Sequence, residues 1–341
     1  MTPVSGRSRT ALTLIGLTVA LILAIVAGVA LGAVPISPGD VAAAFGHVFS
    51  GADRTLTDAL VLELRLPRVL LAALVGAALA LAGVLYQALF RNPLADPYIL
   101  GVSSGAGLGA TLAMMMLGTS YTMRALGVPV GAFIGAALTM LLVVRLASRR
   151  GRLDPTSLLL AGIAVSYILS ALTSFFLVFD REQMSSVVFW MMGGLQNRSW
   201  EHVGTLAVML AIGSIVPAIY HRELDLMLLG DERAGQLGVS VERFKMVMLG
   251  SASLVVAGAV SVSGLIGFVG LMTPHMMRLA LGPRHRLLLP ASVLTGAIVL
   301  VIADLLARLV LAPVEIPVGI VTALAGGPFF LWILVRKEHV R

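Results

Sequence analysis

The sequence predicts an all-α membrane protein, a polytopic bundle of about ten transmembrane helices with both ends of the chain in the cytoplasm. Two observations predict this class. Of the 341 residues, 58% are hydrophobic and 12% are charged, whereas soluble domains usually carry about 25% charged residues. The apolar residues also form charge-free stretches almost from end to end. Residues 1–341 are therefore expected to form a single transmembrane domain.

The predicted helices follow these stretches, because about 20 apolar residues are needed to cross the hydrocarbon core of a bilayer. The stretches are Ala11–Val34, Val69–Phe90, Tyr98–Met123, Ala125–Val144, Thr156–Phe179, Val203–Tyr220, Met246–Thr273, Leu287–Ala303 and Ile316–Val335. The first is longer than the apolar core of a secretory signal, which is about 7–15 residues, and further spans follow it. We therefore expect it to be the first membrane anchor.

The stretch Met246–Thr273 determines the number of crossings. It is long for one helix, contains Gly264, Gly267 and Gly270, and leads into Pro274. These residues predict a helix that ends at about Gly264, a reversal of the chain, and a short helix that ends at about Leu281. Dividing this stretch gives ten helices, so both termini lie on the same side of the membrane.

The distribution of basic residues supports this division, because cytoplasmic loops carry an excess of Lys and Arg. With a cytoplasmic N-terminus, the basic residues expected outside are Arg54, Arg65, Arg68, Arg124, Arg181, Arg198 and Arg308, of 24 in the chain. Without the division, the arginines within 278–286 and the basic C-terminus would move outside. The divided arrangement is therefore preferred.

The sequence argues against an ATPase or a metal site in this chain. A P-loop needs a Gly-rich turn that ends in Gly-Lys-Ser/Thr, and the only lysines, Lys245 and Lys337, follow Phe and Arg. Any ATP-Mg that drives this chain must therefore be bound by a partner, and no cofactor is expected here. The absence of cysteine excludes disulfides and Cys-based metal sites. His275 has no second ligand at metal-binding spacing, so neither metal ligands nor catalytic residues are expected.

Three other classes are disfavoured by where the charges lie. Most basic residues flank apolar stretches, whereas nucleic-acid-binding proteins gather them on a solvated face. Ionisable residues within the spans are nearly absent, and Asp304 and Arg308 lie one turn apart near an outer helix end, where they could pair. A proton- or sodium-coupled carrier usually has acids within its spans. An ion-coupled secondary transporter or a membrane enzyme is therefore only an alternative.

The cytoplasmic segment 222–244 is predicted to have a structure of its own. Apolar residues at helical spacing in Leu224–Leu229 are followed by Gly230 and a second short helical stretch. The charges of this segment are balanced, whereas a helix that lies on lipid favours a cationic face. We interpret the segment as a docking element for a partner protein, with an interfacial helix as the alternative.

Three further motifs lie at the ends of spans. The motif Arg65–Arg68 contains Pro67 at the outer start of the second helix, where the missing N–H of a proline costs nothing. Its two arginines could anchor the helix at the headgroups or meet carboxylates of a partner. The segments Asn92–Pro97 and Pro155–Ser157 are predicted to be short inner turns.

At these motifs the sequence resembles a known family, the permease subunits of binding-protein-dependent ABC importers for iron-siderophores, haem and vitamin B12. These are the FecCD/BtuC-like type II importers. The resemblance covers nearly the whole chain. It rests on the segments Arg65–Arg68, Gln87–Pro97, Gly101–Ala106, Gly267–Arg278, Ala303–Arg308 and Glu315–Phe329.

The resemblance implies a multi-pass permease domain in the bacterial cytoplasmic (inner) membrane. The implied partners in the bilayer are a second permease copy, which would make a homodimer, two cytoplasmic ATP-binding subunits and an extracytoplasmic substrate-binding protein. The implied cargo is a bulky chelate, and the sequence does not choose among a ferric siderophore, haem and cobalamin. The nearest alternative is an ABC permease of the zinc/manganese type.

The resemblance also implies roles for single residues. Arg65, Arg68 and Arg308 match positions that meet glutamates of the binding protein on the outer face. Asn92 and Leu94, together with Thr156 and Ser157, match turns that narrow the cytoplasmic gate. The residues that match the ATPase-coupling helices are Leu229, Gly230, Asp231, Glu232, Ala234, Leu237 and Gly238.

Overall fold

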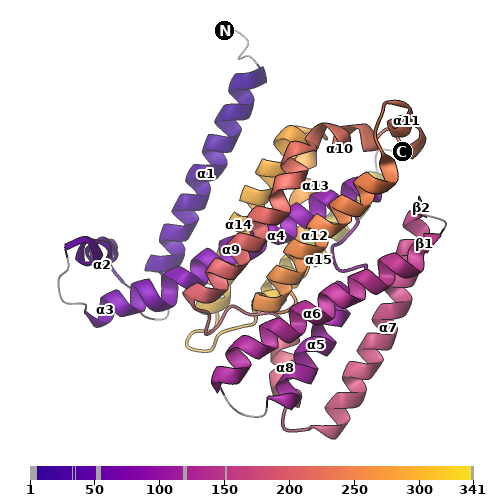
Figure 1. Ribbon diagram of the computed structural model, residues 1–341. Coiled ribbons are helices and arrows are strands. Elements are labelled where there is room, and N and C mark those ends of the chain that lie inside the picture. Colours follow the sequence, from indigo (N-terminus) through magenta and orange to yellow (C-terminus); the bar gives the residue numbers. More distant parts are fainter. Residues whose placement is uncertain are drawn as a thin grey trace.

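The computed structural model describes residues 6–32, 34, 36–50, 55–117, 121–149 and 152–338. These residues form a bundle of helices that run mostly in the same direction or its reverse (Figure 1). Of the basic residues used to orient the chain, Arg54, Arg150 and Arg341 lie outside the described residues.

Ten helices of this bundle correspond to the ten predicted ones. They are α1 (Gly6–Ala30), α4 (Leu66–Leu89), α5 (Val102–Met116), α6 (Tyr121–Ala147), α7 (Pro155–Phe179), α9 (Trp200–Ile219), α12 (Val241–Ser263), α13 (Val269–Leu281), α14 (His285–Leu309) and α15 (Val318–Glu338). Within the described ranges, seven helices are long and apolar enough to cross a membrane, whereas α5, α13 and the apolar part of α15 are shorter. The prediction of an all-helical polytopic bundle is confirmed.

The predicted division of the stretch 246–273 is also confirmed. Helix α12 ends at Ser263, and Gly264 follows with a φ of +67°. Only glycine adopts this backbone conformation without a steric penalty. A Cβ on Gly264 would also lie 2.1 Å from the Trp190 carbonyl oxygen, so the turn has no room for a side chain. The chain then enters α13, which ends at Leu281 as predicted.

Helix α4 forms the centre of the bundle, and 83% of its most apolar window is buried. It packs against α14 and α13 through glycines. A Cβ on Gly76 would lie 2.1 Å from the carbonyl oxygen of Gly296, and one on Gly83 would lie 1.7 Å from that of Gly270. Helices in lipid associate through this close approach of backbones at small residues.

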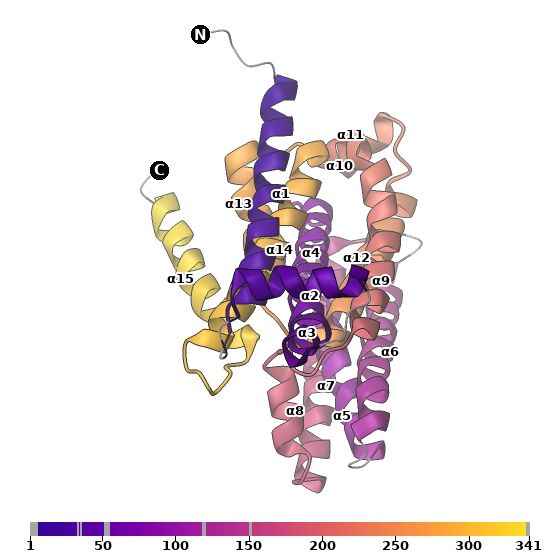
Figure 2. The same ribbon diagram turned by 90° about the vertical axis from the view of Figure 1, so that its left-hand side faces the viewer.

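The smaller elements lie at the ends of the bundle and were not predicted, apart from the two helices of segment 222–244. They are α2 (Pro38–Ser50), α3 (Leu56–Ala59), the π-helical turn η1 (Leu60–Arg65), α8 (Met184–Met191), α10 (His221–Met227) and α11 (Asp231–Gln236). Two strands of two residues each, β1 (Ser148–Arg149) and β2 (Arg152–Leu153), form an antiparallel pair. Helix α2 lies across the bundle at the end of α1 (Figure 2).

The helical structure that leads into α4 begins earlier in the chain than the charge-free stretch predicted. Thr55 and Asp58 form a capping box: the Asp58 N–H donates to the Thr55 hydroxyl at 3.2 Å, and the Thr55 N–H donates to the Asp58 carboxylate at 2.7 Å. This reciprocal pair satisfies donors at a helix start. Helical structure then runs through α3 and η1 into α4. Because this segment contains charged residues, the search for charge-free stretches did not include it.

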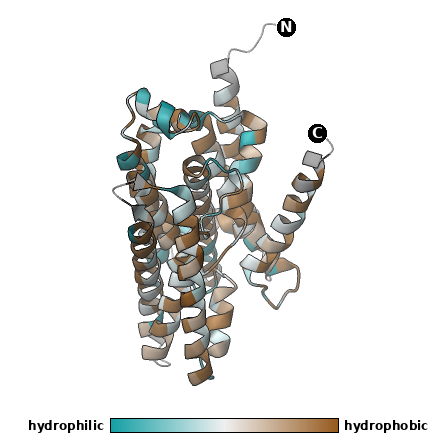
Figure 3. Cartoon of the chain, turned by 90° about the vertical axis from the view of Figure 1, so that its right-hand side faces the viewer, coloured by the Kyte–Doolittle hydropathy of each residue, from teal (hydrophilic) through white to brown (hydrophobic). Residues whose placement is uncertain are grey.

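The two ends of the bundle differ in chemistry. The start of α1 and the end of α15 lie on the same side as α10 and α11, whereas α2, α3 and α8 lie on the other (Figures 1 and 2). Hydrophilic residues gather around α10 and α11, and apolar residues cover most of the helices between the ends (Figure 3). The arrangement agrees with ten crossings and with both termini on one side.

Candidate functional site

On the outer end of the bundle, the structure brings the three predicted arginines together. Arg65, Arg68 and Arg308 all line a pocket of about 300 Å³, which Arg198 and Glu315 also line. Arg65 lies at the end of η1 and Arg68 in the first turn of α4, while Arg308 comes from the last turn of α14. Residues more than 230 positions apart in the sequence therefore share one site.

Two carboxylates form ion pairs with arginines of this cluster. Arg68 donates from Nε to Asp304 Oδ1 at 3.0 Å and from Nη1 to Glu315 Oε2 at 2.9 Å. Arg308 pairs through Nε with Asp304 Oδ2, also at 3.0 Å. The predicted pairing of Asp304 with Arg308 is confirmed. The second acid, Glu315, was not predicted as a partner, because no local pattern links it to Arg68.

The other two arginines hold the end of α1. Arg65 donates from Nη1 to the carbonyl oxygens of Val29 and Ala30, both at 3.0 Å. Arg308 donates from Nη2 to the Gly28 carbonyl oxygen at 2.9 Å. The last four carbonyls of a helix lack partners within the helix, and cations are favourable at that end of the helix dipole. Arg65 and Arg308 are therefore buried and already bonded within the chain, at 8% and 6% exposure.

On the cytoplasmic end, the first predicted gate turn follows α4. The Leu94 N–H donates to the Asn92 side-chain oxygen at 2.9 Å, a local bond typical of an Asx turn. The residue before them, Arg91, has a φ of +47°, which is uncommon for a residue with a side chain. Asn92 and Leu94 are both exposed, so the turn presents its side chains to the outside of this chain.

The second predicted gate turn is the start of α7. Asp154 is its N-cap and accepts a hydrogen bond from the Ser157 N–H at 2.8 Å. That hydrogen bond holds the pKa of the Asp154 carboxyl below its ordinary value. Pro155 takes the first helical position, where its missing donor is not needed. Thr156 is exposed and Ser157 is partly exposed.

The segment between α9 and α12 forms two short helices, as its pattern predicted. Gly230, with a φ of +102°, separates α10 from α11, and Gly238, with a φ of +93°, follows α11. Leu229 and Leu237 are 51% and 58% exposed, whereas Ala234 is fully buried. Of the two acids that begin α11, Glu232 is exposed and Asp231 forms ion pairs within the chain. The segment thus exposes apolar side chains at this end of the bundle.

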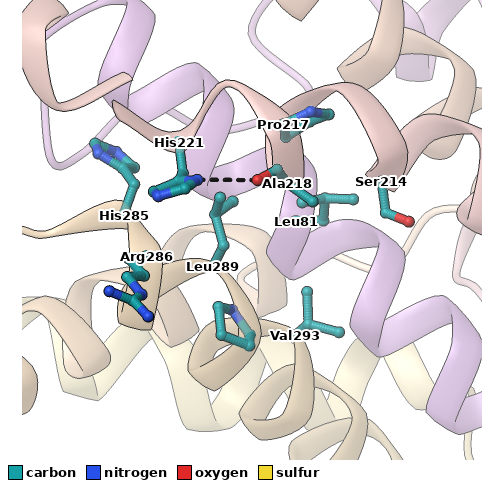
Figure 4. A pocket seen from close by; sticks show the side chains of 10 residues that line it. Leu81, Ser214, Pro217, Ala218, His221, His285, Arg286, Leu289 and Val293 are labelled. Atoms are coloured by element: carbon teal, nitrogen blue, oxygen red, sulfur yellow. Dashed lines mark hydrogen bonds between the residues drawn. The ribbon is translucent and has the colours of Figure 1, made fainter. Parts of the chain in front are cut away.

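A separate cavity of about 400 Å³ lies between α9, α10 and α14. Its lining is mainly apolar, with the side chains of His221, His285 and Arg286 at one end (Figure 4). None of the predicted site residues lines it. Among the residues that the structure describes, no group of three His, Asp or Glu side chains is arranged to hold a metal ion.

Comparison with known families gives a clear result. The family model described as the FecCD transport family matches residues 20–336 of the chain. The chain belongs to the FecCD transport family. It is therefore a multi-pass membrane permease, a transport component without an ATPase domain. Membership also separates it from ion-coupled carriers and from membrane enzymes.

Individual relatives match this chain over most of their length. The chain is 45% identical over 275 residues to the cobalamin import system permease protein BtuC of Halobacterium salinarum, covering 81% of this chain and 73% of that protein. It is 40% identical over 281 residues to the hemin transport system permease protein HmuU of Yersinia pestis, covering 82% and 84%. It is 39% identical over 277 residues to the Fe(3+) dicitrate transport system permease protein FecD of Escherichia coli, covering 81% and 85%.

A solved structure has the same fold. It is described as an inward-facing conformation of an ABC transporter of metal-chelate type. Its superposition has a TM-score of 0.83 at 32% sequence identity, covering 95% of this chain and 98% of that one. The overall arrangement of helices in this chain is therefore shared with a solved ABC transporter.

Proposed function

We propose that this chain is the membrane subunit through which an ABC importer moves a bulky metal chelate into the cell. The family match over residues 20–336 carries this proposal. The relatives named above are permeases for cobalamin, hemin and ferric dicitrate, so a ferric siderophore, haem or cobalamin is the proposed class of cargo. Small ions are not in that set, which disfavours a zinc/manganese-type permease.

The proposed driving force is ATP hydrolysis on two separate cytoplasmic subunits, one for each permease copy. The coupling segment 222–244 supports this assignment, because Leu229 and Leu237 expose apolar side chains on a polar end of the bundle. Exposed apolar side chains in a polar rim are typical of protein contact sites. Residues from Leu229 to Gly238 would lie in the cleft of an ATPase subunit.

The proposed partner on the outer face is a substrate-binding protein. Its carboxylates would approach the pocket lined by Arg65, Arg68 and Arg308, whose described lining holds four arginines and one acid, Glu315. Because these arginines also hold α1 and α14, the docking test uses Arg68→Gln, which removes one charge and leaves both contacts to α1. We expect weaker capture of the binding protein by nanodisc-embedded permease. A single symmetric peak of the variant on size exclusion at the assay temperature is the control for folding.

A second copy of this chain is proposed to face α7. Only 17% of the most apolar window of α7 is buried within the chain. Its exposed residues include the polar side chains of Tyr167 at the middle of the helix and Ser170 one turn further along. Polar groups at mid-membrane depth favour protein or a water-filled path over lipid. We infer that α7 lines a path between two identical permease copies.

The natural absence of cysteine makes this arrangement testable. A Tyr167→Cys variant should give cross-linked dimers with bifunctional thiol reagents in membranes. The matched control is Val208→Cys on α9, which is 58% exposed but lies on a helix that the proposal does not place between the two copies. Equal cross-linking at both positions, or none at position 167 with any spacer length, would contradict the homodimer.

The cargo is tested by uptake into proteoliposomes that contain the permease, its ATPases and its loaded binding protein. Labelled ferric siderophore, haem and cobalamin are compared, each with and without ATP inside the vesicles. We expect ATP-dependent accumulation of one chelate and none from the permease alone. Accumulation by the permease alone, driven by a proton gradient, would overturn the proposed function.

A further inference from the structure

Lys245 occupies an unusual position for a lysine. It lies in the first turns of α12 at the cytoplasmic end of the bundle, and its side chain is only 4% exposed. Its ammonium group pairs with the Asp231 carboxylate, donates to the Leu153 carbonyl oxygen at 3.3 Å and lies 3.9 Å from Glu242 Oε1. A buried charge is tolerated only when it is paired and hydrogen-bonded, so these contacts define where the ammonium group must lie.

Lys245 is connected to the first gate turn through Asp231 of the coupling segment. Asp231 is the first residue of α11 and follows the Gly230 joint. Its second carboxylate oxygen lies 3.5 Å from Nη2 of Arg91, the residue with positive φ that precedes Asn92. The Asp231 carboxylate is therefore shared between Lys245 on α12 and Arg91 beside the gate turn. A displacement of α11 moves the common partner of both cations.

The other contact leads to the second gate turn. Leu153 is the last residue of β2 and precedes Asp154, the N-cap of α7. Its carbonyl oxygen accepts from Lys245, and its N–H donates to Glu242 Oε2 at 2.6 Å. The first turns of α12 thus hold both main-chain polar groups of Leu153. Any shift of the Lys245 ammonium group is passed to the backbone that leads into Thr156 and Ser157.

We propose that Lys245 is the positioning residue that links the movement of α11 to both cytoplasmic gate turns. One ammonium group contacts the coupling helix and the chain entering α7, and it shares Asp231 with Arg91. When an ATPase displaces α11, the ammonium group follows its carboxylate partner, because separation would leave a buried charge unpaired. This inference rests on the proposed function of segment 222–244 as the ATPase-coupling element.

The test measures chelate molecules taken up per ATP hydrolysed in the complete importer. Lys245→Met removes the charge and keeps a similar length, and we expect the ratio to fall by about fivefold or more. Lys245→Arg, which keeps the charge, should restore most of the ratio. Arg145→Met, which removes an exposed cation from the cytoplasmic end of α6, is the matched control and should leave the ratio unchanged.

A merely structural role would lower the melting temperature without changing the ratio, and that outcome would overturn the inference. A double variant provides a second measurement: if Asp231 and Lys245 act in one route, Asp231→Asn with Lys245→Met loses no more than the larger single loss. Additive losses would also contradict the proposal. Failure of the proposed function itself is distinguishable, because the unsubstituted importer would then show no ATP-dependent uptake at all.

Discussion

At the residue scale, Asp304 is the more deeply buried of the two acids that pair with the arginine cluster. Its side chain is 1% exposed and pairs with both Arg68 and Arg308. We predict that Asp304→Asn lowers the free energy of unfolding by about 3–5 kcal/mol, because removal of one partner leaves buried charge uncompensated. The measurement is thermal unfolding in detergent, monitored by loss of the monodisperse peak on size exclusion.

The matched control for this prediction is Glu315→Gln. Glu315 pairs with Arg68 as Asp304 does, but its side chain is 32% exposed, so water replaces the lost contact in part. The effect on the melting temperature should be clearly smaller. Equal effects of the two substitutions would show that the burial of Asp304 does not determine its contribution.

Single residues also show the limit of sequence reasoning. The pairing of Asp304 with Arg308 could be predicted because residues four apart on a helix are neighbours. The partners of Arg65 could not be predicted, because they are backbone carbonyls of α1 that lie more than 30 positions earlier. The sequence gives only a general indication of these partners, because a helix end needs hydrogen-bond donors and arginine supplies several. No sequence pattern says which arginine meets which helix.

At the scale of elements, the glycine contacts of α4 set how closely its neighbours approach. We predict that Gly76→Ala costs about 1–3 kcal/mol of stability, as overpacking usually does, since the added Cβ would lie 2.1 Å from the Gly296 carbonyl oxygen. The control is Gly250→Ala on α12, where a Cβ meets nothing within 4 Å. Melting temperatures in detergent compare the two. A neutral Gly76→Ala would mean that α4 and α14 can separate at no cost.

The joint between α10 and α11 gives a prediction about coupling. Gly230 has a φ of +102°, and a Cβ there would lie 3.0 Å from Nη1 of Arg91. Gly230→Val therefore strains the joint and crowds Arg91, and we predict ATP hydrolysis with little uptake in the reconstituted importer. Gly235→Ala, within α11, is the control, because a Cβ there would make only an ordinary contact with Val241 Cγ2 at 3.9 Å. Uptake per ATP equal to that of the unsubstituted importer would contradict the role of this joint.

The elements that could be predicted are the membrane-spanning helices, because the lipid core requires apolar residues in them. Charge-free stretches identified the spanning helices, and the glycines after Ser263 identified the divided one. The early start at Leu56, helix α8 and the strand pair at 148–153 were missed. These lie at the polar ends of the bundle, where tertiary contacts such as the Leu153–Glu242 hydrogen bond stabilise short elements that carry no periodic signal.

At the scale of the whole molecule, buried and exposed helices differ in what they contact. Helix α4 is enclosed by its neighbours and holds the bundle together, whereas α7 is largely uncovered within one copy. The ends of the bundle carry the polar sites, an arginine cluster on one side and the coupling segment on the other. The proposed path between two copies would need this division, with one helix held by its neighbours and another open to the partner copy.

The arrangement of the whole chain is fixed by the divided helix, and this gives the last prediction. With ten crossings, position 284 lies on the cytoplasmic side and position 311 on the outer side. Because the chain has no cysteine, Arg284→Cys and Leu311→Cys can each be labelled with a membrane-impermeant maleimide in intact spheroplasts. We expect labelling of Leu311→Cys alone, and of Arg284→Cys only after the membrane is opened. Nine crossings would reverse both results, since an undivided stretch 246–273 places every later segment on the opposite side. Asp40→Cys on α2, which is outside in either arrangement, controls for access of the reagent.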